Sequence, residues 1–133
     1  MSTKEAKLWK KINQLQKGRK DWHLTRIESS TINVIPDIYG CIDGSSFWLE
    51  LKANEVKNCN LSKFQINWHI KHRQVGGKSF ILNFHASQCA LKLLEVHDSR
   101  AVHLIAESPV TSDVFDEKLI LLIHRAARSA GKW

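Results

Sequence analysis

The stretch that decides the fold comprises residues 33–53 and reads NVIPDIYGCIDGSSFWLELKA. Two apolar runs, IPDIYGCI and SSFWLELKA, flank Asp43-Gly44, a dipeptide that favours a tight turn between antiparallel strands. Pro36 lies at the start of the first run, where a strand tolerates a residue without a backbone N–H. The stretch therefore predicts a β-hairpin that turns at Asp43-Gly44.

Three charged side chains in this hairpin are costly to bury unless they find partners. Alternation along the second strand puts Trp48, Glu50 and Lys52 on one face and Phe47, Leu49 and Leu51 on the other. Counting outward from the turn places Asp37 directly opposite Glu50, with Cβ atoms about 4.5–5.5 Å apart. The register thus predicts two neighbouring carboxylates, with Lys52 one step further along the strand.

This arrangement favours a metal site. Two adjacent carboxylates repel each other, and a divalent cation between them removes the repulsion. Mg²⁺ prefers such oxygen ligands, and a bound metal activates water and neutralises charge that develops on phosphorus. Lys52 can orient an attacking water and stabilise the transition state. The alternative is an ion pair between an acid and Lys52 on an exposed sheet face.

The remaining chain predicts an α/β fold with a mixed sheet. The helix between the third and fourth strands is the natural crossover between parallel strands. Ser112 or Asp113 can cap the last helix, and Gly76-Gly77 ends the crossover helix. We expect helices over 3–16, 61–75 and 112–131, strands over 21–30 and 78–84, and a second hairpin over 89–96 and 101–107.

Charge and composition narrow the function. The chain has 133 residues, a net charge of +7 and three cysteines, which share no metal-binding spacing. Positive charge spread over many segments favours a polyanion such as nucleic acid. Without an apolar signal or spanning segment in the sequence, we expect a cytoplasmic protein, in the host-cell cytoplasm if it is phage-encoded, and no membrane partner.

The crossover helix contains a glutamine with two interpretations. Leu61, Phe64, Trp68 and Val75 predict a packed stripe, with Gln65 on the same face and directed toward the sheet. The residues Ser62 to Gln65 also match a capping box, in which the glutamine serves only its own helix. The opposite side carries Ile66 and Ile70, which either pack under the last helix or mark a dimer face.

The order of motifs resembles the PD-(D/E)xK nuclease superfamily. Pro36-Asp37 is followed by a hairpin and then by Glu50-Leu51-Lys52; RIESS precedes the motif and LSKFQINWHIKHRQVGG follows it. The chain looks like compact phage-type members related to VRR-NUC domains and Holliday-junction resolvases. The resemblance covers about residues 4–84 and implies a restriction-endonuclease-like αβββαβ core with a C-terminal hairpin and helix (about 88–130), in a single nuclease domain, 1–133.

The resemblance also implies roles for individual residues. Asp37 and Glu50 would bind Mg²⁺ or Mn²⁺, Lys52 would be the catalytic lysine, and Gln65 a functional glutamine. Either Glu28 or Glu5 would add an acidic ligand, although each also has an ordinary structural explanation. Resolvase-like relatives are usually two-fold dimers, so a homodimer is expected. The candidate DNA contacts are Lys57, Lys63, Lys71, Arg73, Lys78 and, more weakly, Ser30.

Three functions compete. The first is a Mg²⁺- or Mn²⁺-dependent DNA endonuclease, with selectivity for branched structures as one form of it. The second is a basic nucleic-acid-binding module without catalysis, which explains the charge but not a carboxylate pair on a phosphate-binding surface. The third is a sugar hydrolase with two carboxylates, which the positive charge and the neighbouring lysine disfavour.

Overall fold

The computed structural model describes residues 3–27 and 34–129. Its strands form one sheet in chain order, in which β3 and β4 are parallel and all other neighbours are antiparallel. The element order is α1 (Thr3–Gln16), β1 (Trp22–Arg26), β2 (Ile38–Ile42), β3 (Ser45–Lys52), the 3₁₀ helix η1 (Lys57–Asn60), α2 (Lys63–Gln74), β4 (Ser79–His85), β5 (Ala90–Val96), β6 (Val102–Pro109) and α3 (Phe115–Arg128). The predicted α/β order of elements is present.

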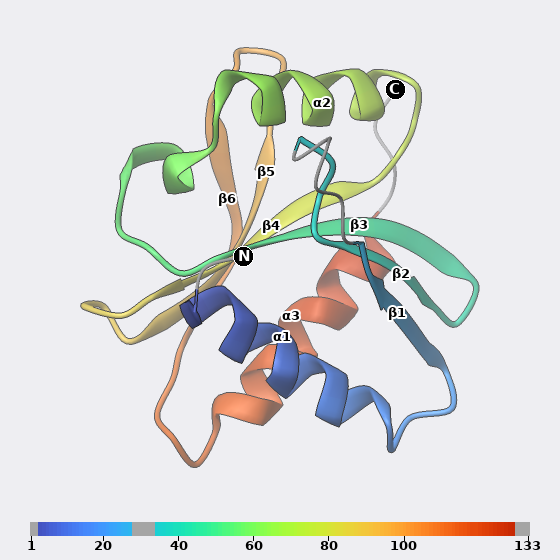
Figure 1. Ribbon diagram of the computed structural model, residues 1–133, viewed down its shortest axis with the longest axis vertical. Helices are drawn as coiled ribbons and strands as arrows, with labels where there is room; N and C mark the ends of the chain where they lie inside the picture. The colour runs from blue at the N-terminus through green and yellow to red at the C-terminus, as the bar shows by residue number, and fades with distance from the viewer. Residues whose placement is uncertain (1–2, 28–33, 130–133) are drawn as a thin grey trace.

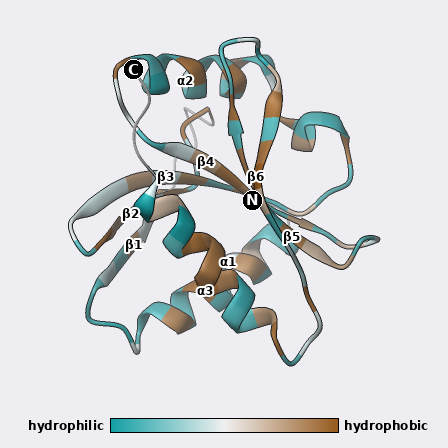
Figure 2. Ribbon diagram, turned by 180° about the vertical axis from the view of Figure 1, so that it is seen from behind, coloured by the Kyte–Doolittle hydropathy of each residue, from teal (hydrophilic) through white to brown (hydrophobic). Residues whose placement is uncertain are grey.

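Helices cover both faces of the sheet. Helix α2 connects the parallel strands β3 and β4 and lies on one side, whereas α1 and α3 lie together on the other (Figure 1). Hydrophobic residues gather where α1 and α3 lie beside each other (Figure 2). No helix within the described residues is long and apolar enough to cross a membrane.

The sheet separates two hydrophobic clusters. The larger one joins the buried faces of α1 and α3, such as Ile12 and Leu119, to Phe47, Leu49 and Leu51 of β3. The smaller one lies on the α2 side and contains Cys59, Ile66, Ile81, Leu94 and Val96. The alternation predicted for β3 is therefore present, because its apolar side chains enter the larger cluster and leave Glu50 and Lys52 on the α2 side.

The hairpin of β2 and β3 has the predicted register. Asp43 and Gly44 both have positive φ, +48° and +84°, as a two-residue type I′ turn requires. Ile42 pairs with Ser45 and Ile38 with Leu49, so the next position outward brings Asp37 to Glu50. Gly40 pairs with Phe47, and a Cβ added at this glycine would lie 2.8 Å from the phenyl ring. The ring fills the space that the glycine leaves.

Two predictions about helices are wrong. Phe64 and Val75 are 60% and 79% exposed, whereas Ile66 is buried, so the packed face of α2 is not the expected stripe. Ile66 and its neighbour Ile70 pack against the sheet rather than under α3, which lies on the opposite side. At the last helix, neither Ser112 nor Asp113 is the cap, because the N-cap residue is Val114 and no side chain caps it.

Candidate active site

The start of β2 and the end of β3 hold two carboxyl groups in a reciprocal arrangement. The backbone N–H of Asp37 donates to Oε1 of Glu50 over 3.1 Å. In return, the backbone N–H of Leu51 donates to Oδ2 of Asp37 over 2.9 Å. Each carboxyl group is thus bound by the strand that carries the other, and the hairpin register fixes both.

Burial makes this pair electrostatically unusual. Glu50 is only 4% exposed, and burial together with the charge of Asp37 raises the pKa of Glu50 to about 8, against the opposing effect of Lys52. Burial also raises the pKa of Asp37, although the hydrogen bond from Leu51 opposes the rise. In the absence of a cation, the pair therefore resists carrying two negative charges near neutral pH.

Two further side chains meet Glu50. The Nζ atom of Lys52 lies 3.8 Å from Oε2 of Glu50, and Nε2 of Gln65 donates to the same oxygen over 2.8 Å. The capping box also forms, because Oε1 of Gln65 accepts from the backbone N–H of Ser62 and the Ser62 hydroxyl accepts from the backbone N–H of Gln65. Both interpretations of this glutamine therefore hold at once.

The structure describes only one of the two candidates for an additional acidic ligand. Glu5, in the first turn of α1, is close enough to Asp37 for its charge to raise the pKa of the Asp37 carboxyl. Glu28 lies outside the described residues, as does Ser30, the weaker candidate for a DNA contact. Of the two candidates, the structure thus places Glu5 near the pair.

The oxygen-rich donor set fits a hard divalent cation. Asp37 and Glu50 offer carboxylate oxygens side by side, and their raised pKa values, caused mainly by burial, mean that a bound cation would favour the charged form of both groups. Within residues 3–27 and 34–129, no group of three or more His, Cys, Asp or Glu side chains is arranged to hold a metal. Among these residues, a metal at the Asp37–Glu50 pair would have two carboxyl groups of the protein as ligands, with water or substrate oxygens completing its coordination.

The candidate DNA contacts divide into two groups. Arg73 forms an ion pair with Glu95, with Nη1 and Oε2 2.5 Å apart, and Nζ of Lys78 donates to the carbonyl of Ala127 over 2.7 Å. Because both cations have partners inside the protein, we do not retain them as DNA contacts. The other three candidate cations, Lys57, Lys63 and Lys71, are exposed.

An aromatic cluster on the same face of the sheet was not predicted. Tyr39 and Trp48 pair across β2 and β3 with ring centroids 5.0 Å apart, and Trp48 meets Trp68 of α2 at 5.5 Å. His72 stacks on Trp68, with centroids 4.8 Å apart. The alternation that groups Glu50 with Lys52 also puts Trp48 on this face, so the signal was present in β3. No local sequence pattern indicates that Trp48 contacts Trp68 of α2.

Comparisons with known proteins address the fold. No protein-family model and no curated protein sequence matches the chain. Among solved structures, the chain matches Hjc, a Holliday junction resolvase from the archaeal hyperthermophile Archaeoglobus fulgidus, with a TM-score of 0.53. The fold is similar to that of Hjc. The match covers 78% of this chain and 87% of Hjc at 14% sequence identity, so the likeness concerns the fold alone.

This likeness confirms the predicted fold class. The mixed six-stranded sheet, with helices on both faces and a C-terminal helix, is the restriction-endonuclease-like α/β architecture that the motif order led us to expect. The carboxyl pair lies at the end of the β2–β3 hairpin in this architecture, next to the first turns of α1 and α2.

Proposed function

We propose that the protein is a metal-dependent DNA endonuclease that hydrolyses phosphodiester bonds. One observation carries the proposal: the half-buried carboxyl group of Asp37 and the buried one of Glu50 lie side by side, with Lys52 next to them. Burial of like charges in a sheet is destabilising unless a cation compensates them. The similarity to a Holliday junction resolvase supports DNA as the substrate.

The residues of the site have separate tasks in this proposal. Asp37 and Glu50 bind Mg²⁺ or Mn²⁺, which, when bound, activates water and compensates charge on the phosphate. Lys52 orients the water and donates to the oxygen on which negative charge develops. Gln65 is a positioning residue, because its amide holds Oε2 of Glu50 and leaves that carboxylate one orientation. Glu5 adds negative charge on the α1 side.

Exposed cations around the site would bind the DNA backbone. Lys57 on η1 and Lys63 and Lys71 on α2 belong to the two elements that follow β3 in the chain. Such contacts position a duplex without reading its sequence. The proposal has five finer parts. They are selectivity for branched DNA, a two-fold dimer, a phage-type origin close to VRR-NUC domains, action in the cytoplasm and a single nuclease domain over 1–133.

A cleavage assay tests the proposal. Supercoiled plasmid and a four-way DNA junction are incubated with the protein in Mg²⁺, in Mn²⁺ and in EDTA. We expect cleavage with either metal and none in EDTA. Asp37→Asn keeps an oxygen for the Leu51 N–H but loses the charge, and Lys52→Ala loses the ammonium; each should lower the rate by at least about a hundredfold.

The matched control lies in the same hairpin. Asp43→Asn also removes one carboxylate, but the exposed turn at Asp43 lies at the far end of the strands from the site. Asparagine tolerates the positive φ of this position, so this variant should cleave at the wild-type rate. Absence of metal-dependent cleavage of both DNAs would refute the proposal and leave the non-catalytic binding module as the better explanation of the charge.

A further inference from the structure

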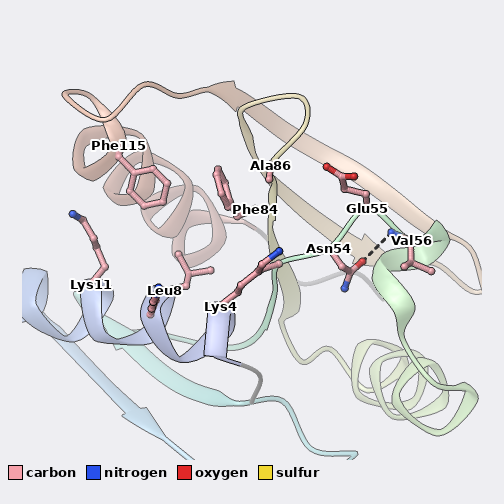
Figure 3. Close-up of a pocket in the computed structure, with 11 residues that line it drawn as sticks. Lys4, Leu8, Lys11, Asn54, Glu55, Val56, Phe84, Ala86 and Phe115 are labelled. Carbon is pink, nitrogen blue, oxygen red and sulfur yellow. Dashed lines mark hydrogen bonds between the residues drawn. The ribbon is translucent and has the colours of Figure 1, made fainter.

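A cleft of about 690 Å³ lies beside residues 53–56, the segment that follows Lys52 of the candidate site in the chain. Its walls are α1, the residues after β3, the turn between β4 and β5, and the start of α3 (Figure 3). Ala53, the residue after Lys52, lines it. The first turn of α1 borders both regions, because Glu5 acts on Asp37 while Lys4 lines the cleft. The cleft and the carboxyl pair are therefore neighbours.

The floor of the cleft is apolar and partly aromatic. Phe84 of β4 and Phe115 of α3 line it, with their rings edge to face and centroids 5.7 Å apart. Leu8 of α1 and Ala86 of the β4–β5 turn add aliphatic surface (Figure 3). Such a floor suits a flat, weakly polar group, and the volume is in the usual range of small-ligand pockets.

The rim of the cleft is cationic on the α1 side. Lys4, Lys7 and Lys11 follow one another at spacings of three and four residues, which put them on one face of the helix. Lys11 is also paired with Asp116 at 3.1 Å, whereas Lys4 and Lys7 are exposed. An apolar floor beside a row of lysines fits a ligand that combines an aromatic ring with negative charge.

We propose that this cleft binds an unpaired nucleotide of the DNA substrate, with the base on the Phe84–Phe115 floor and the flanking phosphates on Lys4 and Lys7. A base inside a duplex cannot enter, because both of its faces are stacked on its neighbours. An extrahelical or single-stranded base has a free face, which aromatic side chains bind without sequence preference. The inference rests on the proposed function and assigns its substrate class: DNA with an unpaired base near the cleaved bond.

Equilibrium binding in EDTA tests this inference apart from cleavage, because the proposed reaction needs a metal. Three fluorescently labelled DNAs of one sequence are compared by anisotropy: a fully paired duplex, the same duplex with a one-nucleotide bulge, and that bulge with an abasic site in place of its nucleotide. We expect the bulged duplex to bind about tenfold more tightly than the other two, the size of effect that one stacked base produces.

Variants assign the preference to the cleft. Ala86→Trp places a large side chain in the cleft from an exposed turn, and it should abolish the preference while affinity for the paired duplex stays unchanged. Lys4→Ala/Lys7→Ala should weaken binding of the bulged duplex. The matched control, Lys10→Ala/Lys17→Ala, removes two exposed lysines of the same N-terminal region that do not line the cleft, and it should keep the wild-type ratio.

Two results would overturn the inference. Equal affinity of the wild type for the base-bearing and abasic bulges would show that flexibility of the DNA, not its base, is recognised. A preference that persists in a folded Ala86→Trp variant would place the base elsewhere; should that variant not fold, the abasic comparison with the wild type still decides. Metal-dependent cleavage without any preference would refute this inference alone, whereas absence of cleavage would refute the proposed function.

Discussion

Gln65 shows how one side chain can serve a helix and a site together. Its carbonyl oxygen accepts from the backbone N–H of Ser62 over 2.9 Å, and its amide nitrogen donates to Glu50 over 2.8 Å. The capping contact already fixes the plane of the Gln65 amide. Its NH₂ group therefore points at the Glu50 carboxylate, and the second hydrogen bond costs the side chain no additional conformational entropy. Helix initiation and carboxylate orientation are therefore coupled at this residue.

A pair of variants separates the two tasks of Gln65. Ser62→Ala removes the hydroxyl of the cap and should cost about 1 kcal/mol of unfolding free energy while the contact with Glu50 remains. Gln65→Ala should cost a similar amount and in addition lower the rate of metal-dependent cleavage about tenfold or more, since Oε2 of Glu50 loses its donor. Urea denaturation and initial cleavage rates measure the two effects. Equal cleavage rates in the two variants would show that this glutamine only caps its helix.

At the scale of elements, α2 buries a histidine, His69, in its packed face, whereas its Phe64 is exposed. His69 is 1% exposed, and its Nδ1 lies 2.8 Å from the hydroxyl of Ser79 in β4. His69 is thus buried beside Ile66, and the half-buried His72 packs over Gly77, where an added Cβ would lie 2.2 Å from the ring.

The buried histidine predicts a loss of stability in acid. Burial lowers the pKa of His69 from its ordinary value of 6.5 to about 4. Below pH 6.5 the unfolded chain therefore binds a proton at this residue that the folded protein refuses, and the contribution of His69 to the free energy of unfolding should fall as the pH drops from about 6.5 toward 4. The raised pKa of Glu50 contributes in the opposite direction, so the effect of His69 is measured as a difference from a variant without this ring. Above pH 6.5 the neutral ring should make no pH-dependent contribution.

Thermal unfolding measured from pH 4 to pH 8 checks this prediction. His69→Gln keeps a hydrogen-bonding group for Ser79 but cannot titrate, so its midpoint temperature relative to that of the wild type should rise as the pH falls from 6.5 toward 4. Gln74→Ala, an exposed substitution in the same helix, should retain the wild-type profile. The prediction is wrong if His69→Gln and the wild type lose the same stability between pH 6.5 and pH 4.

At the scale of the whole molecule, the C-terminal third belongs to the core. The motifs lie in about residues 4–84, and nothing in the later sequence resembles a motif. Yet α3 buries Leu119, Leu122 and Ile123 in the larger cluster, against the strands that carry the site. Lys78, which precedes β4, also donates to the carbonyl of Ala127 near the end of this helix. The hairpin that places the carboxyl pair therefore rests on α3.

Neighbouring positions of α3 test this dependence. Ile123 is fully buried, so Ile123→Ala should lower the free energy of unfolding by about 2–5 kcal/mol. Leu121 is 56% exposed, and Leu121→Ala should change it by no more than about 0.5 kcal/mol. Urea denaturation followed by tryptophan fluorescence compares the two variants. Equal, small losses would mean that α3 contributes little to the core.

Sequence alone determined the part of the site that is local. Asp43 and Gly44 adopt the positive φ values of their turn, the turn sets the register, and the two-residue period of a strand carries that register outward to Asp37, Glu50 and Lys52. These steps depend on backbone geometry within one hairpin, so they could be predicted without knowledge of distant contacts. The element order and the fold class followed from similar local patterns of turns and periodicity.

Tertiary structure alone decided what depends on competition between surfaces. Packing against the sheet buries Ile66 and His69 of α2 rather than Phe64, and the assembled fold pairs Arg73 with Glu95. It also formed the cleft between α1, α3 and the β4–β5 turn, whose walls are far apart in the chain. The physical reason is that burial is non-directional: a helix with apolar groups on several sides packs whichever side the sheet can accommodate, and only the assembled sheet determines which one that is.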